Sequence, residues 1–224
     1  MKKIKIISAL LSAALLAACF TSCDAKGGRE SESETYDFDT PELAFEAMTD
    51  AAEKGDYSDA LRCYRSGAAD AKDSILVNSY YFYSMAAADY TEKGCIGYPL
   101  DIVNNHVEAG FSPAQKLQAD LLTASRRLNG VYEMSDMYVY IIDGKIAASV
   151  GTQIPEEAIC TDELVMIKDE FYWAKHNKNG EDELLYKLEL SGNTLVVTTA
   201  ESNTDDIFSG TYTSTNVELP ILYY

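Results

Sequence analysis

The chain has 224 residues, with 36 Asp and Glu against 18 Lys and Arg, and its formal net charge is −18 at pH 7. Such an acidic surface argues against binding to nucleic acid and favours cations or basic partners. Hydrophobic residues make up 47% of the chain, which is ordinary for a folded protein with a packed core.

The N-terminal residues carry a pattern typical of secretion. Three lysines among the first five residues precede an almost uninterrupted apolar run at positions 6–18. This run has the length of a signal-peptide core and is too short to span a bilayer stably. We therefore expect residues 1–18 to be a signal peptide.

The apolar run ends in Leu16-Ala17-Ala18-Cys19. This tetrapeptide resembles the lipobox of bacterial lipoproteins, in which a leucine and two small residues precede a lipidated cysteine. The resemblance implies that a lipid on Cys19 anchors an extracytoplasmic protein to a bacterial membrane. The stretch that ends at Cys23 is a poorer match to the lipobox, and an ordinary cleaved signal without lipid is the alternative.

Residues 19–40 are predicted to be a flexible acidic stalk. The segment is rich in Gly, Ser and Glu. It therefore offers too little apolar surface to offset the entropy of folding.

Residues 41–129 are predicted to form a helical-hairpin domain, because apolar residues recur there at three- and four-residue spacing. Thr40 and Pro41 provide an N-cap and a first-turn proline. We expect five helices, at 40–55, 57–66, 73–93, 99–109 and 112–128.

The stretch from Gly55 to Tyr64 is similar to the turn and second helix of a tetratricopeptide repeat. Glu53-Lys54-Gly55 recurs as Glu92-Lys93-Gly94, but Pro99 stands where Ala60 would repeat. The resemblance implies a tetratricopeptide-like domain, and helical repeats usually present a surface to peptides or partner proteins.

Residues 130–224 are predicted to form an antiparallel β domain, so that the fold class is α+β. Asp143-Gly144 is a strong hairpin signal between two strands. About eight short strands favour a curled meander or a small barrel, with 217–223 as an edge strand. We expect strands at 131–134, 137–142, 145–150, 164–168, 170–174, 184–190, 195–199 and 208–213.

The sequence carries no zinc-protease pair, nucleophile elbow or phosphate-binding glycine loop, and its two histidines, His106 and His176, lie in different halves. We therefore predict no catalytic activity, no metal site and no cofactor. Cys63, Cys95 and Cys160 could form disulfides or be isolated buried thiols, and the spacing leaves this open.

Two aromatic clusters are the candidate ligand-binding residues: Tyr80, Tyr81 and Tyr83 in the third helix, and Tyr172 and Trp173 in a strand. One interpretation is a stacking platform for a glycan or peptide. The interpretation we favour for the helix cluster is packing within helical hairpins together with contact with the β domain, and a similar structural role is favoured for the strand cluster. Strand alternation should place Tyr172 on the face opposite its neighbours.

These features predict a surface-anchored protein-interaction or scaffolding module whose partner is another envelope protein. The alternative is a carrier of a glycan, peptide or lipid inside the β domain, and an envelope hydrolase is a third hypothesis. The first two differ in a measurable property. A carrier needs an open barrel with a lined cavity, whereas an interaction module does not.

Overall fold

The computed structural model describes residues 35–151, 157–160, 162–176, 182–204, 206–217 and 221–223. The predicted signal peptide, the predicted lipidation site Cys19 and most of the predicted stalk lie outside these residues. The residues from 34 onward belong to one compact unit. Among the described helices, none combines the length and the apolar character that crossing a membrane requires.

The helices follow one another between residues 41 and 125, as the sequence predicts. Short turns of 3₁₀ helix, η1 (Ala68–Asp70) and η3 (Ser112–Ala114), separate some of them. The α-helices are α2 (Pro41–Lys54), α3 (Tyr57–Arg65), α4 (Ser74–Ala88), α5 (Gly97–Glu108) and α6 (Gln115–Ser125).

The ends of α2 form for the reasons that the sequence suggests. The Thr40 side chain accepts a hydrogen bond from the backbone N–H of Leu43, and Pro41 stands in the first turn. Gly55 ends the helix in the left-handed conformation, with φ of 82°. Small side chains such as Ala44 and Ala52 on its buried face allow α3 and α4 to pack closely.

The third predicted helix differs from the prediction at its C-terminal end. We expected it to run to Lys93, but α4 ends at Ala88 and the chain continues as a π-helical turn, η2 (Asp89–Lys93). Gly94 then ends this turn with φ of 78°. A π-helical turn is wider than an α-helical turn. It therefore shifts the chain out of the register that α4 would have kept if it had continued to Lys93.

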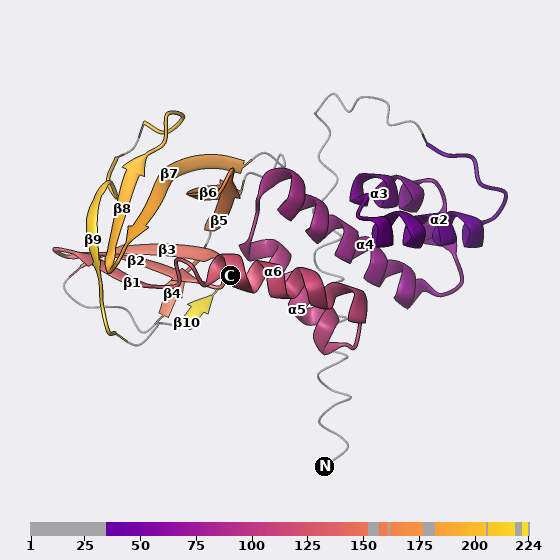
Figure 1. Cartoon of the computed structure of the whole chain (residues 1–224), viewed down its shortest axis with the longest axis horizontal. Helices are drawn as coiled ribbons and strands as arrows, with labels where there is room; N and C mark the ends of the chain where they lie inside the picture. The colour runs from indigo at the N-terminus through magenta and orange to yellow at the C-terminus, as the bar shows by residue number, and fades with distance from the viewer. Residues whose placement is uncertain are drawn as a thin grey trace, which may run out of the picture. The chain divides into compact units, whose positions relative to one another are not determined.

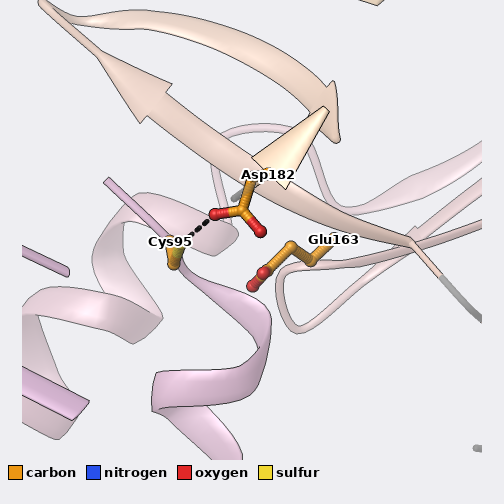
Figure 2. A group of neighbouring side chains, drawn as sticks. All are labelled: Cys95, Glu163 and Asp182. Carbon is orange, nitrogen blue, oxygen red and sulfur yellow. Dashed lines mark hydrogen bonds between the residues drawn. The ribbon is translucent and has the colours of Figure 1, made fainter. Parts of the chain in front are cut away.

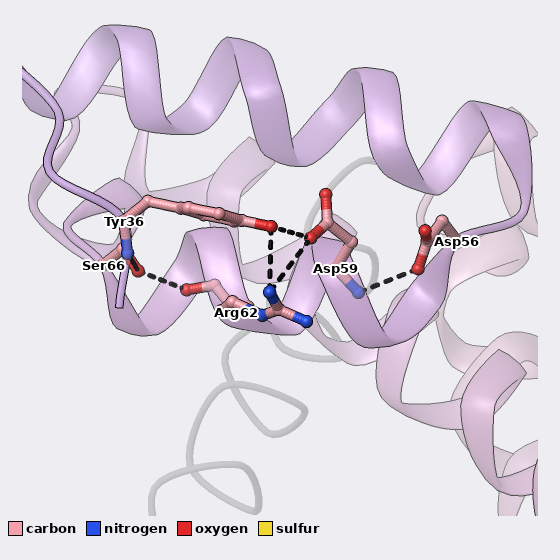
Figure 3. Close-up of polar contacts among 5 residues, drawn as sticks. All are labelled: Tyr36, Asp56, Asp59, Arg62 and Ser66. Carbon is pink, nitrogen blue, oxygen red and sulfur yellow. Dashed lines mark hydrogen bonds and ion pairs between the residues drawn. The ribbon is translucent and has the colours of Figure 1, made fainter. Parts of the chain in front are cut away.

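The segment that precedes α2 is fastened to α3 by polar contacts (Figure 3). The backbone N–H of Tyr36 donates to Ser66 Oγ at 2.9 Å, and its phenol donates to Asp59. The Arg62 guanidinium donates to the same phenol oxygen at 3.0 Å and lies over the Tyr36 ring. Phe38 packs against the core between the helices. Residues 36–38, the end of the predicted stalk, thus lie against the helices.

Eight antiparallel strands close into a barrel, so that the chain is α+β, as predicted (Figure 1). Neighbouring strands pair in the order β1-β2-β3-β5-β6-β7-β8-β9, and β9 pairs with β1 to close the ring. The barrel strands are β1 (Gly130–Met134), β2 (Met137–Ile142), β3 (Lys145–Val150), β5 (Asp162–Ile167), β6 (Glu170–His176), β7 (Asp182–Ser191), β8 (Thr194–Thr199) and β9 (Gly210–Ser214).

Two short strands stand outside the barrel. The sequence did not predict β4 (Glu157–Ile159), which pairs in parallel with β10 (Ile221–Tyr223). The predicted edge strand at 217–223 is therefore shorter, and it belongs to a separate two-stranded sheet. Parallel pairing of segments far apart in the chain carries no local turn signal, which is why the sequence pattern missed it.

Tight turns connect the barrel strands. Asp143 and Gly144 have φ of 49° and 79°, as a two-residue hairpin of the predicted kind requires. Lys168 and Asp169 also have positive φ, although neither is glycine. The short turns fix the register between successive strands.

The barrel interior is filled by side chains. Tyr132, Leu164 and Tyr212 are at most 2% exposed and lie in one cluster with inward-facing residues of the other strands. The same cluster includes residues of the helices, among them Leu100 of α5 and Leu121 of α6. Helices α4, α5 and α6 therefore share one hydrophobic core with the barrel, whereas α2 and α3 pack around a separate core.

The chain after η2 completes the barrel wall between β3 and β5. These two strands share only a short ladder, Lys145 with Glu163 and Ile146 with Asp162. Beyond it, residues 94–96 pair with β5: the Ile96 N–H donates to the Leu164 carbonyl at 3.0 Å, and the Met166 N–H donates to the Gly94 carbonyl at 2.9 Å. We call residues 94–97 the seam segment, because it joins the helices to the barrel.

Candidate functional site

The aromatic residues predicted in the third helix lie on α4 and pack between helices. Tyr80 is 8% exposed and meets the ring of Phe111 edge to face. Tyr81 stacks on Tyr64 of α3 with ring centroids 4.2 Å apart. Tyr83 meets the ring of Tyr57, and burial raises its pKa. Because these rings face different neighbours, they do not form one flat platform.

Tyr172 and Trp173 lie on opposite faces of β6, as strand alternation predicts. Trp173 is 3% exposed inside the barrel, and its indole N–H donates to Asp162 Oδ2 at 2.6 Å. Tyr172 is on the outer face, where its phenol donates to Glu170 at 2.9 Å. The five candidate aromatic residues are therefore not brought together at one site.

A shallow, open depression of about 460 Å³ lies on the described surface. Its lining consists of short polar side chains and one acid at the junction of β1 and β9: Glu133, Ser135, Thr213, Ser214 and Thr215. Drug-sized ligands usually bind in concave sites that bury most of their surface in apolar walls. This depression is too open to bury most of a ligand, and its walls are polar.

Three side chains able to bind a metal converge next to the seam segment (Figure 2). Cys95 comes from the seam segment, Glu163 from β5 and Asp182 from the first position of β7. One ligand atom from each lies within 4.8 Å of those of the others. The Cys95 thiol donates to Asp182 Oδ2 at 3.1 Å. We call these residues the Cys95 cluster.

The Cys95 cluster is largely shielded from solvent. Cys95 is 3% exposed and Glu163 is 6% exposed, whereas Asp182 is partly exposed. Burial, together with the nearby charge of Glu163, raises the pKa of the Cys95 thiol. A buried thiol between two carboxyl groups is thus protonated at neutral pH unless a cation compensates the charge.

Backbone and charged groups orient the cluster. The backbone N–H of Tyr98, in the first turn of α5, donates to Glu163 Oε2 at 3.3 Å. The N-cap residue of α5 makes no side-chain hydrogen bond of its own. The Glu163 carboxylate, which belongs to the neighbouring strand β5, therefore caps this helix. Lys93 is ion-paired with Asp89 at 2.9 Å, and the hydrogen bond to Asp89 raises the pKa of the Lys93 ammonium group, with a smaller contribution from the charge of Asp182.

An ion pair between a buried lysine and a partly exposed aspartate lies beside Glu163. Lys145, the cross-strand partner of Glu163, is 6% exposed and contacts Asp101 of α5 at 2.5 Å. Buried lysines are almost always paired. This ion pair and the hydrogen bond from α5 to Glu163 hold α5 against β3 and β5.

The three cysteines that the structure describes are free thiols, Cys63, Cys95 and Cys160. Cys63 lies in the core between α2 and α3, whereas Cys160 donates to the Ile146 carbonyl at 3.0 Å. The pairing that the sequence left open between Cys63 and Cys95 is therefore not formed.

No local sequence pattern predicts the Cys95 cluster. Metal motifs are recognised when ligands recur at short, fixed spacing on one element. Here the ligands come from three elements that are far apart in the chain. The recurring triplet Glu92-Lys93-Gly94 lies at the end of the π-helical turn that precedes Cys95.

No known protein family, no curated protein and no solved structure matches this chain.

Proposed function

We propose that this protein is a lipid-anchored, extracytoplasmic interaction module. In this proposal a lipid on Cys19 holds the protein at a bacterial membrane, and the folded part binds another envelope protein. The proposal includes no catalytic step and no nucleic-acid partner. The acidic surface, with a net charge of −18, favours a partner with a basic binding face.

The observation that carries the proposal is the filled barrel. A carrier would need space inside the barrel, but Tyr132, Trp173 and Tyr212 occupy the interior together with aliphatic side chains. Eight-stranded barrels are just wide enough either to be filled by side chains or to hold one small ligand. Since this barrel is filled, binding on the outer surface is favoured over the carrier alternative.

The first turns of α2 and α4 offer an apolar face for such a partner. Glu42 and Lys72 approach to 3.8 Å, which places the two helix starts close together. Leu43, Ile75 and Leu76 are exposed there, and Ile75 has 81% of its surface in solvent. We propose that α2 and α3 form a tetratricopeptide-like pair, in line with the sequence resemblance, and that α2 presents this face together with the start of the next helix, α4.

Crosslinking in intact cells tests the proposal. A photo-reactive side chain placed beside Ile75 should capture one defined protein repeatedly from cells that carry the anchored form. Ile75→Asp should abolish this adduct, whereas Val150→Asp should leave it intact, because Val150 is a comparably exposed residue of the barrel (62%). Cys19→Ala should reduce the adduct by removing the anchor.

Two results would contradict the proposal. If no protein is captured above background with the anchored form, the interaction role is wrong. If Ile75→Asp and Val150→Asp weaken capture equally, then the proposed face is wrong even if a partner exists.

A further inference from the structure

The Cys95 cluster combines a thiol and two carboxyl groups, which come from three separate elements of the fold. All three groups can be anions, and two of them are more than nine-tenths buried. Bringing like charges together away from water is unfavourable unless protons or a cation neutralise them. We propose that Cys95, Glu163 and Asp182 bind one divalent metal ion, and that Zn²⁺ fits the site best.

The types of ligand favour zinc over the alkaline-earth ions. Thiolate sulfur is a soft ligand that Mg²⁺ and Ca²⁺ do not select, whereas Zn²⁺ accepts both cysteine thiolate and carboxylate ligands. Three protein ligands around a tetrahedral ion leave a fourth position for water. The chemistry of the site therefore matches a zinc ion with one open position.

The distances allow this coordination with small movements. Zinc–sulfur and zinc–oxygen bonds of about 2.3 and 2.1 Å place tetrahedral sulfur and oxygen ligands roughly 3.6 Å apart. The Sγ atom of Cys95 already lies 3.1 Å from Asp182 Oδ2, and all three ligand atoms lie within 4.8 Å of one another. Shifts of roughly an ångström suffice.

The surroundings supply the outer contacts that metal ligands usually have. The Tyr98 N–H orients the Glu163 carboxylate, much as outer hydrogen bonds orient ligands in known metal sites. Cys95 itself is fixed by backbone pairing on both sides, through Gly94 and Ile96. A bound ion would join the seam segment to β5 and β7, and so link the helices to the barrel.

The rival explanation is a purely hydrogen-bonded cluster. In that case the protonated Cys95 thiol donates to Asp182, and the ammonium group of Lys93 supplies positive charge nearby. This explanation predicts no stoichiometric metal binding, so a direct measurement distinguishes the two.

The test is titration of the reduced full-length chain, in detergent where the anchor requires it, with ZnCl₂ and with CoCl₂. Cobalt is a spectroscopic substitute for zinc, and thiolate ligation gives a charge-transfer absorption. We expect about one equivalent of tightly bound metal, the thiolate absorption with cobalt, and a higher midpoint of thermal unfolding with zinc.

Three variants locate the site. Cys95→Ser should abolish the thiolate absorption and weaken binding at least tenfold. Asp182→Asn should weaken binding at least tenfold as well, and it should fold normally because Asp182 is partly exposed at a strand start. Cys160→Ser is the matched control, since it removes another buried thiol and should leave binding unchanged.

Far-ultraviolet circular dichroism confirms that each variant is folded. The proposal is overturned if the folded wild-type chain binds no stoichiometric zinc or cobalt. It is equally overturned if both Cys95→Ser and Asp182→Asn bind the metal as tightly as the wild type does. The result does not depend on the interaction partner, so it is independent of the proposed function.

Discussion

Glycines at the seam segment allow the backbones of the helices and the barrel to approach each other. A Cβ atom on Gly94 would lie 2.0 Å from the Met166 carbonyl oxygen, and one on Gly97 would lie 2.5 Å from that of Gly144. Real Cβ atoms do not approach backbone this closely, so a larger residue must push the strand away. The pairing of residues 94–96 with β5 depends on this contact.

Gly94→Ala and Gly55→Ala form a matched pair that tests this contact. Both glycines end helical segments at similar positive φ, 78° and 82°, but no atom lies within 4 Å of a Cβ on Gly55. Gly55→Ala should cost about 1 kcal/mol, from backbone strain alone. Gly94→Ala should cost at least about 3 kcal/mol, because the clash adds to the strain.

Urea denaturation of both variants measures the difference. Equal losses of unfolding free energy would show that the close approach at Gly94 contributes nothing beyond its backbone conformation.

Among the elements, β9 closes the barrel, and Tyr212 is its buried residue. The Tyr212 side chain is fully buried, and its phenol donates to the Phe208 carbonyl at 2.9 Å. Burial raises the pKa of Tyr212 from 10.0 to about 12. Ionisation of this phenol would place a charge inside the barrel, so the folded state keeps the proton.

This shift predicts a pH dependence with a definite sign. Above pH 10 the unfolded chain releases the proton while the folded chain keeps it, so stability falls as the pH rises from 10 to 12. At pH 11 the loss attributable to Tyr212 is about 1.4 kcal/mol. Tyr212→Phe should cost about 1 kcal/mol near pH 8, through the lost hydrogen bond, but little or nothing near pH 11.

Urea unfolding of the wild type and Tyr212→Phe at both pH values checks this prediction. The other tyrosines titrate in both proteins and largely cancel. An unchanged difference in unfolding free energy between the two pH values would contradict the assignment of the shift to Tyr212.

At the scale of the whole molecule, one hydrophobic core extends from α4, α5 and α6 into the barrel, and α2 and α3 pack beside it around a core of their own. Leu100 and Leu121 belong to the same cluster as Trp173 and Leu188. The ion pair between the buried Lys145 and Asp101 crosses the same boundary, as does the pairing of residues 94–96 with β5. These contacts favour a single cooperative unfolding unit.

Trp173, the single tryptophan, makes this testable, because it lies inside the barrel. Its fluorescence follows the barrel, whereas far-ultraviolet ellipticity near 222 nm mainly follows the helices. We expect the two signals to give coincident urea transitions. Two separated transitions would mean that the helices and the barrel unfold independently.

The sequence by itself determined the order and approximate bounds of most elements. Local signals carry this information: the cap at Thr40 and Pro41, the apolar periodicity of the helices, and the turn at Asp143-Gly144. It also placed Trp173 and Tyr172 on opposite faces of a strand, because alternation follows from backbone geometry alone. The departures are the π-helical turn at 89–93 and the β4–β10 pair, where tertiary contacts outweigh local preference.

Only the tertiary structure decided whether the barrel is filled and which polar groups meet. Whether an interior is filled depends on how side chains from all strands pack together, and no single strand carries that information. Cys95, Glu163 and Asp182 likewise meet because residues 94–96 pair with β5 and because β5, β6 and β7 are neighbours in the barrel. Contacts between segments distant in the chain are set by the fold as a whole, and the sequence pattern therefore could not reveal them.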